Sequence, residues 1–460
     1  MLALRWIQHD FVSQGLVLAG FGLLLILAAW TQLNVGGVPL RSLVGVFLLG
    51  ALMATRQAAF WRALSIHKNM LYLTAAFAIL GAGVSFINDM EPAKIVRELT
   101  EIHVQTAVCL MVGAMVAEIC GPKSIVIVLC GAVAVSAFVA AAQFFQIDAA
   151  WGLRSLLHTF TYDPYDRGED GRASGLSYSP ISLATELCLA LAAFVIYRQR
   201  RAEARGTPSS FDLTVVLAAV IFAAFCLASG NRSPLLGGAV FLLIYTLFRA
   251  PKWALFVAPL VILAVPAADL VFSHLQGTGL RVFETGDKSS EGRGTLFYYG
   301  LRLFIDRPIG YGLGFHPADH WMKYWNEFKN MPNSGVIVTY PLHNYILNML
   351  NFYGAGMLLL VPLALRMAVR NFSVWLAFVP YVAHILLHNY GPLWNDTTIM
   401  FVLPLAWPGL YGMTAARPAV RHDRVTAARA ARAARIARRA SGGGRHKLGP
   451  DGEPGLQSAE

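Results

Sequence analysis

Arginine and histidine side chains that could act together in chemistry are concentrated in four short polar segments. The segments are G-R-A-S-G-L-S-Y-S-P (171–180), S-G-N-R-S-P (229–234), E-G-R-G-T (291–295) and P-L-H-N (341–344), and they contain Arg172, Arg232, Arg293 and His343. A guanidinium is permanently charged and binds phosphate oxygens through two parallel hydrogen bonds. Histidine, whose pKa lies near ambient pH, is the usual general base. Each residue also has a structural interpretation, because interfacial Arg often extends to lipid headgroups and a single interfacial His is more often a hydrogen-bonded structural residue.

Two further patterns in the same part of the chain contain residues that could take part in binding or catalysis. Arg302 lies in T-L-F-Y-Y-G-L-R-L-F-I-D (295–306), whose apolar spacing predicts a helix lying along a membrane surface. His316 and His320 have the i, i+4 spacing of a helical metal pair, but no Glu general base accompanies them. The sequence therefore predicts no metal site and no bound cofactor.

Composition defines the elements that must position these side chains. The chain has 460 residues, of which 56% are hydrophobic and 14% charged, far from the average of soluble proteins. Its apolar blocks of roughly 16–22 residues are each long enough to cross a bilayer with some tilt. The predicted fold class is an all-α membrane protein with about 12 transmembrane helices. The predicted spans are Gly15–Leu33, Ser42–Thr55, Met70–Ile87, Val104–Ile119, Ser124–Phe145, Ile181–Tyr197, Leu213–Ala228, Pro234–Phe248, Trp253–Phe272, Tyr345–Met367, Ser373–Tyr390 and Thr397–Met413.

The positions of Lys and Arg predict the orientation of these spans. The loops on the N-terminal side of the membrane carry most of the basic residues, which places both termini in the cytoplasm. A large extracytoplasmic loop then separates spans 9 and 10. Because this loop is rich in Trp, Tyr and Phe, we expect a folded cap over an active site rather than disorder. The predicted divisions are helices 1–9 in residues 1–272, a catalytic loop in 273–344, helices 10–12 in 345–416 and a tail in 417–460.

The formal net charge of +11 is explained largely by the C-terminal tail. Arg recurs at every third position over part of residues 421–439, and a helix of this kind is attracted to the anionic inner leaflet of a membrane. Nucleic-acid binding would need a folded reader or interleaved aromatic residues, which this tail lacks. We therefore expect membrane lipids, and no nucleic acid, as partners. The end of the tail, from Ser441, is expected to be disordered.

The ordered set of segments resembles the O-antigen ligase and O-antigen polymerase superfamily of polytopic membrane glycan transferases. The matching pieces are R-A-S-G-L-S-Y-S-P-I-S-L-A, S-G-N-R-S-P-L-L-G, G-R-G-T-L-F-Y-Y-G-L-R-L-F-I-D-R-P-I-G-Y-G-L-G-F and H-N-Y-I-L-N-M-L-N-F-Y-G-A-G. They stand in the family's order and cover about half of the chain. The family often has Gln and then Glu along the helix after His343, where this chain has Asn348 and Phe352.

The resemblance implies a function in surface polysaccharide biosynthesis at the bacterial cell inner membrane. The donor would be a glycan linked to undecaprenyl pyrophosphate, transferred with inversion to an acceptor sugar or glycolipid without a metal. On this hypothesis His343, Arg293 and Arg232 are catalytic, and Arg172, Arg302, Asn344 and Tyr299 bind substrate. His343 would act either as a general base or as a contact to the pyrophosphate. Tyr299 would stack on a sugar ring, although anchoring at the interface accounts for it equally well.

Two other classes of protein are alternatives to a glycan-transferring enzyme. A transporter or flippase of the 12-helix type fits the number of spans, but such carriers have repeated halves and substrate sites near the bilayer midplane. This chain has its long loop in one half only, and its ionisable residues cluster at the outer interface, which favours an enzyme. An inactive structural subunit of a glycan-assembly complex is the third interpretation.

Overall fold

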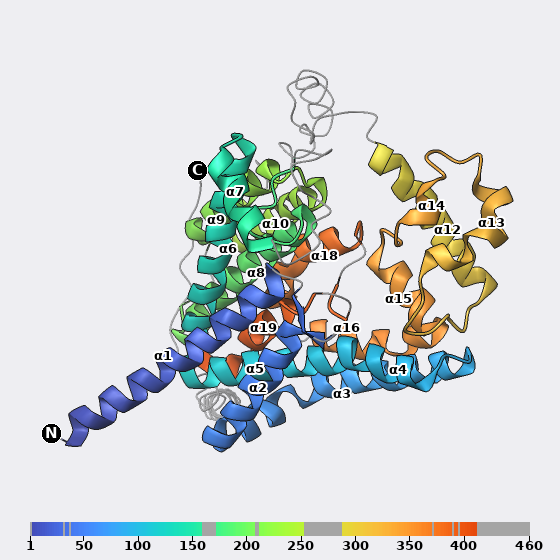
Figure 1. The fold of residues 1–460 in the computed structure, drawn as a ribbon. Coiled ribbons are helices and arrows are strands. Elements are labelled where there is room, and N and C mark those ends of the chain that lie inside the picture. Colours follow the sequence, from blue (N-terminus) through green and yellow to red (C-terminus); the bar gives the residue numbers. More distant parts are fainter. Residues whose placement is uncertain are drawn as a thin grey trace, which may run out of the picture. The chain divides into compact units, whose positions relative to one another are not determined.

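The computed structural model describes residues 2–30, 33–35, 38–158, 172–207, 211–252, 288–369, 372–388, 391–393 and 396–411, which are almost entirely helical (Figure 1). The helices of the first half are α1 (Leu2–Ala29), α2 (Leu40–Thr55), α3 (Gln57–Ile87), α4 (Pro92–Leu99), the π-helix η1 (Thr100–Val104), α5 (Gln105–Cys120), α6 (Pro122–Phe144) and α7 (Asp148–His158). The α-helices of the second half are α8 (Pro180–Ala204), α9 (Leu213–Ala228), α10 (Arg232–Arg249), α12 (Lys288–Asp306), α13 (Trp321–Phe328), α14 (Val336–Thr339), α15 (Tyr345–Tyr353), α16 (Val361–Val369), α17 (Phe372–Trp375), α18 (Val379–Ile385) and α19 (Ile399–Val402). The 3-10 helices are η3 (Pro317–His320), η4 (Ala355–Leu359), η5 (Leu376–Phe378), η6 (Leu403–Ala406) and η7 (Pro408–Tyr411).

The only strands among the described residues form a small antiparallel pair between α1 and α2. These strands are β1 (Asn34–Val35) and β2 (Val38–Pro39), and Val35 lies opposite Val38. The pair reverses the chain between two apolar helices, so it serves as a turn rather than as a sheet.

Several of the described helices are long and apolar enough to cross a membrane. Four meet this criterion alone, namely Gln57–Ile87, Pro92–Cys120, Pro122–Phe144 and Pro180–Ala204. Shorter apolar helices cover Ser13–Ala29, Leu40–Thr55, Leu213–Ala228 and Phe372–Ile385. The described residues therefore form a helical, multi-pass membrane protein, as the hydropathy predicts. The count of 12 spans stays a prediction, and the ninth, Trp253–Phe272, lies outside the described residues.

The segment predicted as the tenth span, Tyr345–Met367, is broken at Gly354. The helices on either side are bent by 108° relative to each other, and Gly354 has a φ of +65°. A Cβ at this position would overlap the carbonyl oxygen of Ile309, so only glycine fits the bend. Hydropathy does not register a break that a distant segment supports, so the sequence alone contained no sign of this bend.

The segment that supports this break is the glycine-containing run P-I-G-Y-G-L-G-F (308–315). The N–H of Tyr311 donates to the carbonyl of Asn351 at 2.7 Å, and the N–H of Ala355 donates to the carbonyl of Pro308, also at 2.7 Å. These bonds use backbone groups that are left without helical partners at the bend, where an unpaired polar group would be costly. The run therefore acts as a structural partner of the broken helix.

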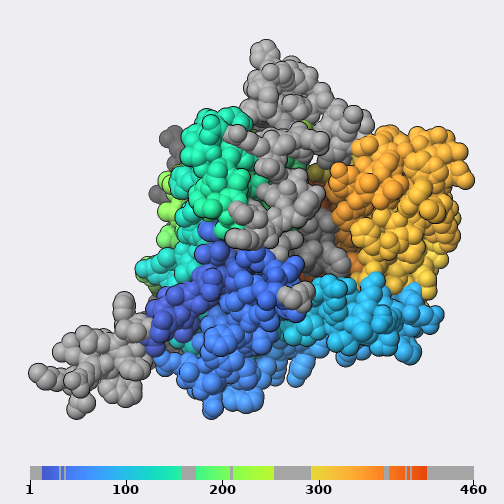
Figure 2. Space-filling model, viewed as in Figure 1, coloured from blue at the N-terminus to red at the C-terminus, as the bar shows by residue number. Residues whose placement is uncertain are grey.

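The elements from α12 to α15 pack together, and α15 also packs on α3 (Figure 1). The yellow and orange atoms of this segment lie together in the space-filling view (Figure 2). Ser85 and Asn88, at the C-terminal end of α3, hold it from below. The Ser85 hydroxyl accepts from the N–H of Leu313 at 2.8 Å, and the Asn88 amide donates to the carbonyl of Gly310 at 3.1 Å. The described part of the predicted cap is thus folded and attached to a transmembrane helix.

The chain divides by its internal contacts into two units, Met1–Tyr411 and Gly412–Glu460. The second unit lies outside the described residues, together with the predicted inner-leaflet helix of the tail. The domain divisions after residues 272, 344 and 416 stay predictions.

Candidate active site

The first polar segment forms a loop that ends at the N-terminus of α8 and is anchored on α6. The Gln143 side-chain oxygen accepts from the N–H groups of Ser174 and Gly175 at 3.0 and 2.8 Å. Gly175 has a φ of +61°, and a Cβ there would overlap the Ser136 carbonyl oxygen. The hydroxyl of Ser136 in turn accepts from the N–H of Leu176 at 3.0 Å. Two buried side chains of α6 therefore set the path of the loop that begins with Arg172.

The second polar segment, between α9 and α10, contacts the first directly. The Asn231 amide donates to the carbonyl of Pro180 at 2.9 Å. A Cβ at Gly230 would lie 3.9 Å from Cγ of Arg172, so the stem of that arginine passes over this turn. Segments that are about 50 residues apart in the sequence thus meet at the N-terminal ends of α8 and α10.

His384 of α18 joins these two helix ends. Its Nε2 lies 3.3 Å from the carbonyl of Ile181, and its Nδ1 lies 2.9 Å from the hydroxyl of Ser233. Because a carbonyl only accepts, the proton is on Nε2, and Nδ1 accepts from Ser233. Both ring nitrogens are therefore occupied within the protein, and the ring, 1% exposed, holds three helices together.

His343 lies just before α15 and presents one free nitrogen. Its Nδ1 is 3.0 Å from the carbonyl of Pro341, so Nδ1 carries the proton in the neutral ring and Nε2 keeps a lone pair. Burial lowers the pKa of His343, and the positive charge of Arg293 lowers it further, while the Pro341 carbonyl acts in the opposite direction. The result is a partly buried, neutral imidazole whose Nε2 can accept a proton.

His388, which follows α18, brings the two parts of the site together. The centroid of its ring lies 4.4 Å from that of His384 and 6.4 Å from that of His343. The positive charges that act on it are those of Arg293 and Arg172. Two arginines and three imidazoles from distant segments of the chain therefore form one cluster, which we call the Arg–His cluster (Arg172, Arg293, His343, His384 and His388).

The arrangement suits an anion next to a group that must lose a proton. Guanidinium ions bind phosphate oxygens in a fixed fork, and partial burial strengthens their electrostatic effect on a bound charge. The free Nε2 of His343 lies in the same cluster and can accept a proton from a hydroxyl. The cluster thus combines stabilisation of a phosphate leaving group with general-base chemistry.

The other predicted site residues occupy different surroundings. Arg232 is the first residue of α10 and is partly exposed, and the next residue, Ser233, bonds His384. Arg302 is nine residues beyond Arg293, which on a helix is about 13 Å further along and on the opposite face. There it pairs with Glu327 at 3.2 Å.

Asn344 and Tyr299 have structural roles in this fold. The Asn344 side chain caps α15 by accepting from the N–H of Leu347 at 2.9 Å. Tyr299 is 0% exposed, and its hydroxyl donates to the carbonyl of Pro317 at 2.7 Å. Because both faces of its ring are covered, Tyr299 has no surface on which a sugar could stack. The stacking role of Tyr299 stays a prediction, and it would require the ring to become exposed.

Within the described residues there is no group of three or more His, Cys, Asp or Glu side chains placed to hold a metal ion. His320, one member of the predicted pair, packs instead against Tyr311 and Phe315, with ring centroids 4.6 and 5.7 Å away. His316 is exposed. His316 precedes the 3-10 helix η3 and His320 ends it, so the spacing of the two histidines is that of a short turn leading into α13.

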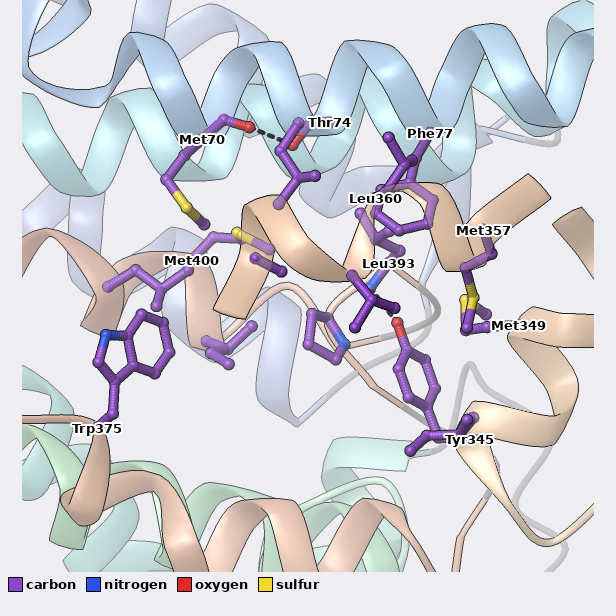
Figure 3. A pocket seen from close by; sticks show the side chains of 17 residues that line it. Met70, Thr74, Phe77, Tyr345, Met349, Met357, Leu360, Trp375, Leu393 and Met400 are labelled. Carbon is purple, nitrogen blue, oxygen red and sulfur yellow. Dashed lines mark hydrogen bonds between the residues drawn. The ribbon is translucent and has the colours of Figure 1, made fainter. Parts of the chain in front are cut away.

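An apolar cavity of about 280 Å³ lies beside the start of α15 (Figure 3). Tyr345, two residues after His343, forms part of its wall. The other walls come from α3, η4, α16, α17 and the segment leading into η6, and they are lined mainly by Met, Leu and aromatic side chains. Its labelled side chains include Met70, Met349, Met357 and Met400 (Figure 3). Unbranched Met side chains adapt to flexible apolar ligands.

His384, His388 and Gln143 were missed as functional residues. One sequence signal for His388 exists, because the tetrapeptide Leu-His-Asn-Tyr occurs twice, at 342–345 and 387–390. His384 and Gln143 lie in apolar blocks and carry no local signal. Gln143 bonds the loop that follows Arg172 across 31 and 32 positions, and the partners of His384 are 151 and 203 positions away.

The fold and the cluster define a multi-pass helical membrane protein with a cationic, histidine-containing centre. A family model described as O-antigen ligase matches residues 217–363, from α9 into α16. This match covers about a third of the chain and confirms the resemblance to the O-antigen ligase and polymerase superfamily. It supports a glycan-transferring enzyme of surface polysaccharide synthesis that uses lipid-linked glycan and acceptor substrates in a membrane. No curated protein matches the chain.

Proposed function

We propose that the protein transfers an oligo- or polysaccharide from undecaprenyl pyrophosphate to a hydroxyl of an acceptor sugar, on the extracytoplasmic side of the inner membrane. The observation that carries this proposal is the convergence of Arg172 and Arg293 with the free Nε2 of His343. An energy-rich phosphate donor needs fixed cations at its leaving group, and an attacking hydroxyl needs a base. The cluster supplies both.

In the proposed reaction the acceptor oxygen forms a bond to the anomeric carbon of the donor. The bond between that carbon and the pyrophosphate oxygen breaks, and its electron pair leaves with the undecaprenyl pyrophosphate. Nε2 of His343 takes the hydroxyl proton. Because attack and departure occur on opposite faces of one carbon, the configuration inverts. His343 returns to its neutral form by releasing the proton to solvent.

Arg172 and Arg293 act on the leaving group in this scheme. Negative charge grows on the pyrophosphate as the glycosidic bond breaks, and two guanidinium ions placed beforehand stabilise it without reorganisation. His384 acts as a positioning residue. Its two hydrogen bonds join the N-terminal end of α8, which follows the loop of Arg172, to the N-terminal end of α10, which begins at Arg232. Arg232 is retained in the proposal as a secondary contact to the donor, on the basis of its segment.

The apolar cavity supports a lipid-linked donor. Its wall includes Tyr345, so it begins within two residues of the proposed base. A polyprenyl chain attached to a pyrophosphate in the Arg–His cluster would find an apolar environment beside it. Burial of its methyl and methylene groups contributes roughly 0.8 kcal/mol for each CH₂.

The test is transfer by the purified full-length protein from a chemically defined lipid-pyrophosphate oligosaccharide. We expect undecaprenyl pyrophosphate to be released in equal amount to the new glycosidic bond. His343→Ala is expected to lower kcat by about 10²- to 10⁴-fold while donor binding changes little. Products lengthened on the lipid carrier would identify a polymerase, and glycan on a separate acceptor lipid would identify a ligase. Full activity of correctly folded His343→Ala protein would overturn the assignment of the base.

A further inference from the structure

His388 is the buried residue of the cluster that the proposed reaction does not yet use. It is 2% exposed, and its Nδ1 has no hydrogen-bond partner among the described residues. Leaving a buried polar nitrogen without a partner is energetically costly, so a ligand is expected to satisfy it. The neighbouring His384 is bonded through both of its nitrogens, whereas Nδ1 of His388 is not, so the two histidines have different roles.

The surroundings of His388 indicate the chemistry of its missing partner. The charges acting on it are the guanidinium ions of Arg293 and Arg172, and its other neighbours are the imidazoles of His343 and His384. A third positive charge is disfavoured in such a place, so the ring stays neutral and offers one N–H donor. Two cations and a neutral donor in one cluster fit an anion with several oxygens.

The repeated tetrapeptide gives independent support for a role in the site. Leu-His-Asn-Tyr occurs at 342–345, where its histidine is the proposed base, and again at 387–390. The two histidine rings lie 6.4 Å apart although 45 positions separate them in the sequence. The fold thus brings the histidines of the two copies into one cluster.

We propose that His388 donates a hydrogen bond to the pyrophosphate of the lipid donor, as a neutral third contact beside Arg172 and Arg293. This inference rests on the proposed function, since it assigns a ligand to the same site. In this scheme His343 takes the proton of the acceptor, whereas His388 is more fully buried and lies within the influence of both arginine charges. The bond would orient the pyrophosphate without adding a charge that binds the released product too tightly.

The experiment separates a hydrogen-bond role from simple packing by using two substitutions of His388 in the full-length protein. His388→Phe keeps an aromatic ring but has no N–H, whereas His388→Gln keeps an N–H donor and loses the ring. The measurements are direct binding of undecaprenyl pyrophosphate, with undecaprenol as the control for the tail, and the KM for the lipid-linked donor. His316→Phe, at an exposed histidine, is the matched control.

We expect His388→Phe to weaken undecaprenyl pyrophosphate binding and raise the donor KM by about 10- to 100-fold. His388→Gln and His316→Phe should stay within a few-fold of the unmodified protein, and undecaprenol binding should not change. Normal pyrophosphate binding by His388→Phe together with impairment by His388→Gln would show that the ring only fills space. If the unmodified protein transfers no glycan, the proposed function fails, while the binding measurements still decide the role of His388.

Discussion

At the scale of single residues, the protonation states around His343 determine what the cluster can do. The Pro341 carbonyl fixes the proton on Nδ1, and Arg293 disfavours a second proton. The ring is therefore ready to accept a proton rather than to give one. His384, with both nitrogens bonded inside the protein, could not take this role.

This arrangement predicts the acidic limb of the pH–rate profile. Because burial and Arg293 lower the pKa of His343, the neutral base persists until the pH falls below that lowered value. We expect kcat/KM for transfer to be flat near pH 7 and to decline only below about pH 6.5, the ordinary value for histidine. In Arg293→Gln the residual activity should show a limb shifted to higher pH. If the acidic limb of Arg293→Gln stays at the same pH as in the unmodified protein, a group other than His343 controls the decline in rate.

The geometry of the guanidinium ions gives a second prediction at this scale. If Arg293 binds the pyrophosphate through its fork, Arg293→Lys should lose nearly as much activity as Arg293→Ala, because one ammonium cannot reproduce two parallel bonds. Arg302→Lys is the matched control on the same helix, since Arg302 pairs with Glu327 on the opposite face. Near-normal transfer by Arg293→Lys would show that Arg293 contributes only a positive charge and not two parallel hydrogen bonds.

At the scale of elements, the break in the tenth span sets the position of the catalytic histidine. α15 ends at Tyr353, where the run 308–315 supplies its backbone partners. Asn348 and Phe352, the two departures from the family pattern, belong to this support. The Asn348 amide donates to the carbonyl of Leu342 at 2.9 Å, and Phe352 packs edge-on against Phe315. Asn348 thus keeps an amide where the family often has Gln, and Phe352 puts an aromatic ring where the family often has Glu.

Substitution at the break tests its importance. Gly354→Ala puts a Cβ into the Ile309 carbonyl and forces alanine into the left-handed region, which alone costs about 1–2 kcal/mol. We expect a fall of several degrees in the melting temperature of the purified protein and a loss of transfer. Gly335→Ala is the control, because a Cβ there would meet open space and its φ is negative. Equal stability of the two variants would show that the bend tolerates rearrangement.

At the scale of the whole molecule, the distribution of Lys and Arg predicts the side of the membrane on which each part lies. A reporter fused within Gly312–Asn333 should score as extracytoplasmic, and one fused after Arg445 as cytoplasmic. Truncation after Arg417 should leave transfer largely intact, since the predicted tail lies across the membrane from the cluster. A reversed reporter result would contradict the orientation, and complete loss of activity at normal membrane levels would give the tail a role in transfer.

The sequence by itself determined the membrane class of the protein, the helix along 295–306 and the four polar segments that contain the candidate arginines and His343. These properties follow from hydropathy and residue type, which are local. Only the tertiary structure decided that the charges of Arg172 and Arg293 both act on His388, and that Tyr299 is covered. It also revealed His384 and His388 and the break at Gly354. Each of these depends on contacts between residues far apart in the chain, such as Ile181 with His384, and a local pattern does not encode how distant helix ends meet.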